Sequence, residues 1–287
     1  MDTSDAKVKV RSRRRLLVLI VSYSVLILAC LVALFPVLWT FSTSLKDISD
    51  ALSIPPKLVG FPASLDNYTK LVQTPDFAST YWATIQITLG STLLAVIVGT
   101  LAAYPLARRR RLVARRPLEV SLVIIRAIPP IVLLVPLYNV VISVGLYDNI
   151  WAIIVVYAAF NLPFVVWLMV SFIQQIPYEL EECAEIDGAS RITIFRRLIL
   201  PLSLPGLGAT TILSALLAWN EFLVPLVLSA KSARTFPLLI STFVQARTID
   251  WGVMAAGAMI AIVPIAIVTV VAQRSLVSGL GLGAVKG

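Results

Sequence analysis

Histidine is absent from this sequence of 287 residues, and cysteine occurs only twice, at Cys30 and Cys183. Imidazole and thiolate groups are the usual protein ligands of zinc, so no metal site of that kind is predicted. The pattern G-x-x-x-x-G-K-[ST] is also missing, which excludes a nucleotide-binding loop of that type. Any ATP chemistry must therefore belong to a partner, and the chain is predicted to be non-catalytic, without a cofactor of its own.

Charge is scarce as well. Only 14% of the residues are charged and 59% are hydrophobic, which gives a mean hydropathy of +0.92 and identifies an integral membrane protein. Six apolar runs are long enough to cross a hydrocarbon core of about 30 Å, which takes roughly 20 helical residues. The predicted spans are approximately residues 16–39, 82–107, 118–144, 150–173, 202–228 and 253–272.

These runs are continuous and do not alternate with polar residues, so they favour membrane helices over the strands of a barrel. The predicted fold class is therefore all-α, a polytopic membrane protein with six transmembrane helices. A basic segment at 1–15 precedes a single membrane domain at 16–287. No connection between the spans is long enough to hold a separate soluble domain.

The basic segment and the first apolar run together could also be read as a cleaved secretory signal. The run is longer than a signal core, and no small-x-small cleavage site ends it. Leu28 stands where a lipoprotein signal before Cys30 would carry a smaller residue. We therefore expect the first span to be retained.

The distribution of basic residues predicts the orientation of the spans. One orientation places 17 of the 24 Lys and Arg residues in the cytoplasm and six outside, with Arg126 inside the third span. Cytoplasmic loops carry the excess of Lys and Arg, so both termini are predicted to be cytoplasmic. The run ARRRRLVARR at 107–116 could indicate nucleic-acid binding in a soluble protein, but anionic headgroups explain it beside a membrane span. No nucleic-acid partner is expected.

A polar insert at 177–201 separates the fourth and fifth spans. A proline suits its helix start, and four glutamates follow in the early turns, where a helix N-terminus favours negative charge. Gly188 suits the left-handed residue that ends a helix, and Ser190 suits the cap of a second one. Pro201 and Pro205 then bend the chain. The pattern predicts a rigid elbow that links a short acidic surface helix to the fifth span.

Both helices of the elbow are predicted to be amphipathic. Apolar or small residues recur at helical spacing in each, and we expect them to share one face per helix. They are Leu180, Cys183, Ala184 and Ile186 in the first helix and Ile192, Phe195 and Ile199 in the second. The acidic helix could lie on the membrane surface or dock into a protein groove. Its negative charge weakens the first interpretation, because the cytoplasmic leaflet is itself negative.

One spaced pattern in the insert is specific. It consists of Glu182, Cys183 and Ala184, then Gly188, Leu198, Leu200 and Pro201. This pattern resembles the cytoplasmic EAA loop of the permease subunits of ATP-binding-cassette (ABC) importers, with Cys183 in place of the central alanine and Leu198 in place of the usual isoleucine. The resemblance extends from about Leu31 to Gly287. It narrows to the second permease subunit of carbohydrate importers of the maltose-transporter class through FPVLWTFSTSLK, LAAYPLARRR, AEIDGA, WNEFLVPL, DWG and GAVKG.

This resemblance implies a type I ABC importer permease fold in which the acidic helix is a coupling helix. Such a helix sits in a cleft of a separate ATPase subunit and carries its closure on ATP binding to the transmembrane helices. The residues carried over are Glu182, Cys183, Ala184, Asp187 and Gly188, with Leu200 and Pro201 holding the elbow. The implied partners are a second homologous permease subunit, two ATPase subunits that bind ATP and Mg, and an extracytoplasmic solute-binding protein. The implied location is the cell membrane of a prokaryote.

A further candidate site lies late in the fifth span, where Trp219, Asn220 and Glu221 follow one another. A stacking ring beside an amide and a carboxylate could contact a sugar in the substrate pathway, or the three residues could anchor the helix at the membrane interface. Arg126 is predicted to extend toward the cytoplasmic end of the third span.

Other function classes remain open. An ion-coupled secondary transporter normally needs intramembrane carboxylates or histidines and repeated halves, of which this sequence offers only Glu221. A membrane anchor without a pathway would leave the spacing from Gly188 to Pro201 unexplained. Importers of sugars, oligosaccharides, sugar derivatives, glycerol phosphate and polyols share these motifs, so the sequence predicts a carbohydrate importer without fixing the solute.

Overall fold

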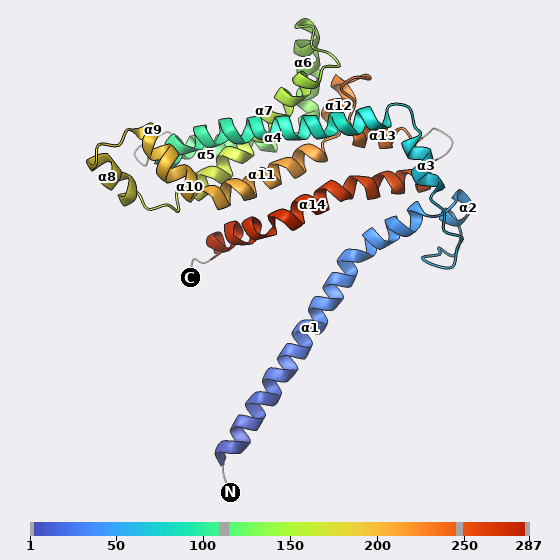
Figure 1. Ribbon diagram of the computed structural model, residues 1–287, viewed down its shortest axis with the longest axis horizontal. Coiled ribbons are helices and arrows are strands. Elements are labelled where there is room, and N and C mark those ends of the chain that lie inside the picture. Colours follow the sequence, from blue (N-terminus) through green and yellow to red (C-terminus); the bar gives the residue numbers. More distant parts are fainter. Residues whose placement is uncertain (1–2, 109–114, 245–248, 285–287) are drawn as a thin grey trace. The chain divides into compact units, whose positions relative to one another are not determined.

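The computed structural model describes the backbone of residues 3–108, 115–244 and 249–284, and the side chains at 18–108, 120–122, 124–244 and 249–270. Its regular elements are helices, and these ranges contain no β-strand (Figure 1). The basic side chains at 7–15 and 109–116, which bear on the predicted orientation, lie outside the described residues.

The helices follow one another along the chain with a π-helical turn, Phe195–Ile199, between α9 and α10. They are α1 (Thr3–Ser44), α2 (Ile48–Ala51), α3 (Asp66–Val72), α4 (Phe77–Arg108), α5 (Arg115–Ala127), α6 (Pro130–Ser143), α7 (Ile150–Ile173), α8 (Glu179–Ile186), α9 (Arg191–Ile194), α10 (Leu200–Leu202), α11 (Leu204–Trp219), α12 (Leu223–Leu228), α13 (Phe236–Ser241) and α14 (Trp251–Ala284).

The all-α fold class is confirmed, and among the described residues four helices are long and apolar enough to cross a membrane. They lie within α1, α4, α7 and α14, and α7 has the bounds of the predicted fourth span. Two further spans arise if each of two bent helix pairs counts as one. The described chain therefore holds four to six candidate spans.

Both bent pairs break at prolines. Helices α5 and α6, on the predicted third span, meet at 84° beside Pro129 and Pro130. Proline has no N–H to donate and disfavours helical geometry in the preceding residue, so adjacent prolines interrupt the helix. The segment Arg191–Leu202 meets α11 at 73°. The run predicted as a fifth span, 202–228, is also divided, because α11 ends at Trp219 and α12 begins only at Leu223.

The described chain divides into two compact units, Met1–Leu71 with Ala246–Met259 and Val72–Gln245 with Ile260–Gly287. In the first unit, the buried amide of Asn67 donates to the carbonyl oxygens of Ser44 at 3.0 Å and Lys46 at 2.7 Å. A Cβ atom on Gly252 would lie 2.5 Å from the same amide. Glycine in the DWG stretch therefore permits a close approach to Asn67.

The second unit is built on α4, α7 and α11, which pack side by side (Figure 1). Small residues allow these helices to approach closely, as is common between membrane helices. A Cβ atom on Gly99 of α4 would lie 2.5 Å from the side chain of Val165 in α7. One on Gly206 of α11 would lie 2.3 Å from the ring of Phe172 in α7. The three helices therefore form one tightly packed body.

A carboxylate also ties two connections of this unit together. Asp148, between α6 and α7, accepts hydrogen bonds from the backbone N–H groups of Ala230, Lys231, Ser232 and Ala233 at 2.9–3.1 Å. Its own N–H donates to the carbonyl oxygen of Leu228 at 3.0 Å. These bonds fix the segment after α12 against the start of α7.

Candidate functional site

The predicted end of the acidic helix at Gly188 is confirmed. Helix α8 ends at Ile186, and Gly188 has a φ of +82°. The N–H of Gly188 donates to the carbonyl oxygen of Glu185, and that of Ala189 to the carbonyl oxygen of Ala184, both at 3.0 Å. These bonds satisfy carbonyl groups that the end of a helix leaves unpaired. The sharp reversal holds α8 in a fixed direction relative to the helix that follows.

Ser190 caps the second helix, as predicted. Its hydroxyl oxygen accepts the N–H of Thr193 at 3.3 Å. Leu200 and Pro201 then lie in α10, immediately before the 73° bend into α11. The elbow that the prolines predict is therefore present.

The buried face of this second helix agrees with the prediction at Phe195 and Ile199 and differs from it at Ile192. Ile192 is 72% exposed, whereas Ile194 and Ile199 are buried. The π-helical turn explains the difference, because its hydrogen bonds join residues five apart, and this wider turn brings such residues closer to one face than an α-helix does. Ile194 and Ile199 share a face for that reason, and Ile192 does not.

The apolar residues of α8 divide between two faces instead of sharing one. Ala184 packs on the buried cluster formed by the ends of α4 and α7, which includes Ala103, Ala107 and Ile173. Cys183 is exposed, and Ile186 is 86% exposed. The outward surface of α8 thus presents acidic groups together with an uncovered apolar side chain.

Glu182, Asp187 and Gly188 also lie on this outward surface and are exposed. The structure therefore brings the predicted coupling residues Glu182, Cys183 and Asp187 to one exposed end of the unit. We call the exposed side chains of Glu182, Cys183, Ile186, Asp187 and Ile192 the outward surface of the loop.

One glutamate of α8 behaves differently, and the sequence interpretation missed it. Glu181 is only 3% exposed. It forms an ion pair with Nε of Arg108, in the last turn of α4, and its Oε2 accepts the hydroxyl of Tyr104 at 2.8 Å. Two signals could have found this cluster: LAAYPLARRR places Tyr104 and Arg108 one helical turn apart, and Glu181 precedes the inward Ala184 by three residues.

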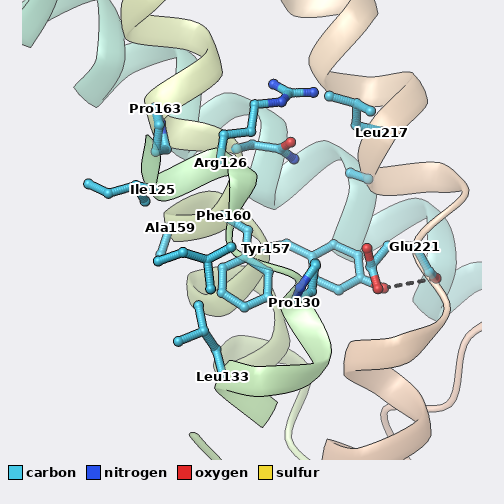
Figure 2. Close-up of a pocket in the computed structure, with 13 residues that line it drawn as sticks. Ile125, Arg126, Pro130, Leu133, Tyr157, Ala159, Phe160, Pro163, Leu217 and Glu221 are labelled. Atoms are coloured by element: carbon cyan, nitrogen blue, oxygen red, sulfur yellow. Dashed lines mark hydrogen bonds between the residues drawn. The ribbon is translucent and has the colours of Figure 1, made fainter. Parts of the chain in front are cut away.

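A cavity of about 240 Å³ lies between α5, α6, α7 and the end of α11 (Figure 2). Its lining is mostly apolar and includes Phe160, Pro163 and Leu217. Four side chains in the lining carry polar groups: Arg126, Tyr157, Asn161 and Glu221. A mostly apolar cavity with a few convergent polar groups is typical of a small-molecule site.

Interactions of the two charged lining residues hold them in place. The guanidinium of Arg126 lies 4.2 Å from the centre of the Phe164 ring. Oε1 of Glu221 accepts the N–H groups of Leu223 at 2.9 Å and Val224 at 3.2 Å, at the start of α12. The hydroxyl of Tyr157 donates to the backbone oxygen of Glu221 at 3.2 Å.

The structure does not gather Trp219, Asn220 and Glu221 in one place. Glu221 lines the cavity described above. The ring of Trp219 is buried and meets the ring of Tyr81 edge to face at 6.0 Å. Asn220 is exposed, and its amide donates to the carbonyl oxygen of Leu216 at 2.8 Å. Arg126, for which no site was predicted, shares the cavity with Glu221 (Figure 2).

The sequence matches a known protein family and several of its members. A family model described as "Binding-protein-dependent transport system inner membrane component" matches residues 95–280. The chain is 38% identical over 258 residues to the trehalose transport system permease protein SugB of Mycobacterium tuberculosis (strain CDC 1551 / Oshkosh), covering 89% of this chain and 93% of that one. It is 32% identical over 265 residues to the trehalose/maltose transport system permease protein MalG of Thermococcus litoralis, covering 91% and 94%.

A solved structure shares the fold. It is a bacterial ABC transporter involved in the import of the acidic polysaccharide alginate, with a TM-score of 0.72 at 23% identity over 91% of this chain and 97% of that chain. A chain of the MetNI methionine ABC transporter matches with a TM-score of 0.60 at 20% identity, covering 75% of this chain and 99% of that one.

Proposed function

The chain belongs to the family of inner membrane components of binding-protein-dependent transport systems, and on that premise we propose that it is one permease subunit of an ATP-driven carbohydrate importer. It forms half of the translocation pathway and has no catalytic residue of its own. Its partners are a second, homologous permease subunit, two ATPase subunits that bind ATP and Mg, and an extracytoplasmic solute-binding protein. It resides in the cell membrane of a prokaryote with both termini in the cytoplasm.

The observation that carries this proposal is the outward surface of the loop. Ile186 is 86% exposed and Ile192 is 72% exposed, although both lie in a chain that buries Ile194 and Ile199 nearby. Exposed apolar side chains among acidic ones are typical of a surface that a protein partner covers. The acidic groups of Glu182 and Asp187 oppose contact with a negative membrane surface. A groove in an ATPase subunit fits this combination.

The elbow supplies the connection from this surface to the membrane helices. Gly188, the Ser190 cap and the bend after Pro201 join α8 to α11 through a short path. Closure of an ATPase around α8 therefore moves α11, whose end lines the cavity beside Glu221. The ATP-dependent step reaches the substrate pathway through this connection.

Carbohydrate as the substrate class rests on two kinds of support. Relatives similar in sequence include permeases named for trehalose, trehalose/maltose and diacetylchitobiose uptake. The cavity offers a guanidinium, an amide and a carboxylate beside the rings of Tyr157 and Phe160. Sugars present hydroxyl groups to such polar side chains and apolar C–H faces to such rings.

Uptake into liposomes tests the proposal. The chain is reconstituted with its second permease and its ATPase, and accumulation of labelled trehalose or maltose is measured with the binding protein outside. We expect uptake to require both ATP and the binding protein. Uptake that persists without ATP and follows an imposed proton or sodium gradient would instead establish an ion-coupled secondary transporter.

A further inference from the structure

Glu181 is buried although it belongs to a helix of an exposed loop. The neighbouring acidic residues of α8, Glu182 and Glu185, are exposed, whereas the side chain of Glu181 is 4% exposed. Burial of a carboxylate is costly unless charged and hydrogen-bonding partners compensate it. Glu181 has both kinds of partner in the last turn of α4, the guanidinium of Arg108 and the hydroxyl of Tyr104.

Arg108 contacts the entry to α8 as well as the helix itself. Its Nη1 donates to the carbonyl oxygen of Ile176 at 3.1 Å. The ring of Tyr178 lies 6.0 Å from its guanidinium carbon. One side chain of α4 therefore holds both the segment before α8 and the first turn of α8.

The contacts of α8 on its other side are looser. A cavity of about 270 Å³ lies between the start of α8 and the elbow, lined by Leu180, Phe172, Leu202, Ser203 and Gly206 among others. The polar contacts of α8 thus reach α4, while open space separates Leu180 from the bend that leads to α11. Within the described residues, the elbow is consequently not the only mechanical connection of α8.

We propose that Tyr104, Arg108 and Glu181 form a polar lock that fixes α8 to α4, so that movement of α8 drives α4 directly. This inference rests on the proposed function, in which α8 is the coupling helix. The three residues are positioning residues, since they set the direction of α8 and do not touch substrate or nucleotide. A buried ion pair, together with the hydrogen bond from Tyr104 to Glu181, resists sliding and rotation in a way that an apolar contact does not.

The packing of α4 explains what such a movement would reach. Gly99 brings α4 against Val165, in the middle of α7, and Asn161 lies one turn away and lines the substrate cavity. A displacement of the end of α4 is therefore passed to α7, because the two helices have no space to slide independently. Movement of α8 would reach one wall of the cavity through α7 and another through α11.

The test compares Glu181→Gln with Glu185→Gln in the reconstituted complex. Both variants remove one negative charge from α8, but only the first breaks the lock. The readout is the number of substrate molecules imported per ATP hydrolysed. We expect this ratio to fall about tenfold in Glu181→Gln, because Arg108 is left buried and unpaired, and to stay at the wild-type value in Glu185→Gln. Equal ratios in Glu181→Gln and the wild type would overturn the proposal.

A second measurement separates coupling from stability. A spin label on Cys183, in a Cys30→Ser background, reports the mobility of α8 in the reconstituted permease subunits before the ATPase is added, since the ATPase would itself cover Cys183. We expect a single immobilised population in the wild type and in Glu185→Gln, and an added mobile population in Glu181→Gln. An immobilised label in Glu181→Gln would contradict the lock.

If Glu181→Gln does not assemble, Tyr104→Phe gives the same test, since it removes one hydrogen bond and keeps the ion pair. A lowered import-to-hydrolysis ratio is expected, and a wild-type ratio would overturn the proposal. If the wild-type complex shows no ATP-dependent import, the proposed function itself is contradicted.

Discussion

At the scale of single residues, the backbone geometry of Gly188 sets the direction of the chain after α8, on which the proposed coupling of ATP hydrolysis to import depends. Its φ of +82° is one that β-branched residues resist, while a Cβ atom there would meet nothing within 4 Å. Gly188→Val therefore changes the direction of the chain after α8 without creating a clash. We expect import per ATP hydrolysed to fall severalfold, measured in the reconstituted complex.

Gly145 provides the matched control for this substitution. Its φ of +71° is also left-handed and its surroundings are equally open, but it lies between α6 and α7, away from the elbow. Gly145→Val imposes a similar strain on the backbone and should leave the import-to-hydrolysis ratio unchanged. Normal coupling in Gly188→Val would argue against the elbow as a lever.

Asp148 is a second residue whose surroundings predict a measurable effect. Burial alone would raise the pKa of this carboxyl, but the N–H groups of Ser232, Ala233, Ala230 and Lys231 lower the pKa from 3.8 to about 2. The stabilisation is therefore complete above pH about 4 and is lost as the pH falls toward 2. Asp148→Asn should lower the hydrogen-exchange protection of residues 230–233 about tenfold at neutral pH, the size expected for a charge-assisted hydrogen bond.

The pH dependence distinguishes this account from a general loss of stability. Protection in the wild type should approach that of Asp148→Asn between pH 4 and pH 2. Asp66→Asn, which changes an exposed carboxylate, should leave residues 230–233 protected. Equal protection in Asp148→Asn and the wild type at neutral pH would show that the carboxylate does not hold this segment.

At the scale of helices, the approach of α4 and α7 predicts a coupled pair of substitutions. A Cβ atom on Gly99 would overlap Val165, so Gly99→Ala should destabilise the protein by about 1–3 kcal/mol, as over-packed cores do. Val165→Ala opens that space. The double variant should therefore be less destabilised than the sum of the two single variants, as judged by thermal unfolding in detergent. Val141→Ala, in the other core cluster, should combine additively with Gly99→Ala.

The same scale shows which elements the sequence could predict. Three features depend on local signals, and the structure has them where they were predicted. They are the bounds of α7, the left-handed Gly188 that follows α8, and the cap at Ser190. The π-helical turn buries Ile194 beside Ile199 and leaves Ile192 exposed, which the sequence could not predict because periodicity assumes 3.6 residues per turn throughout. The buried Glu181 and the shared cavity of Arg126 and Glu221 depend on contacts between distant helices, which no local pattern contains.

At the scale of the whole molecule, the uneven distribution of basic residues predicts a single orientation. In a Cys30→Ser, Cys183→Ser background, Ser232→Cys should react with a membrane-impermeant thiol reagent in intact cells. Ser190→Cys should react only after the membrane is permeabilised. Both positions are exposed in the described chain, so burial within it does not prevent either reaction. The opposite labelling pattern would invert the topology and place the loop away from a cytoplasmic ATPase.

Two sets of exposed apolar side chains are consistent with the proposed complex of permease and ATPase subunits. The described apolar side chains of α1 from Val18 to Phe35 are exposed within the chain, as are Ile186 and Ile192 on the loop. Lipid can cover the first set, which lies on a candidate span. Glu182 and Asp187 beside Ile186 make lipid a poor cover for that end of the loop, and we propose a protein partner there for that reason.

Cross-linking from Cys183 to the ATPase measures that contact most directly. Cys183 is exposed in the chain and lies between Glu182 and Ala184 on α8. In a Cys30→Ser background, a short bifunctional thiol reagent should join Cys183 to a cysteine placed in the ATPase cleft, and a bulky water-soluble thiol reagent should no longer reach Cys183 once the complex has assembled. Full reactivity of Cys183 toward the bulky reagent in the intact complex, with no cross-link, would contradict the account.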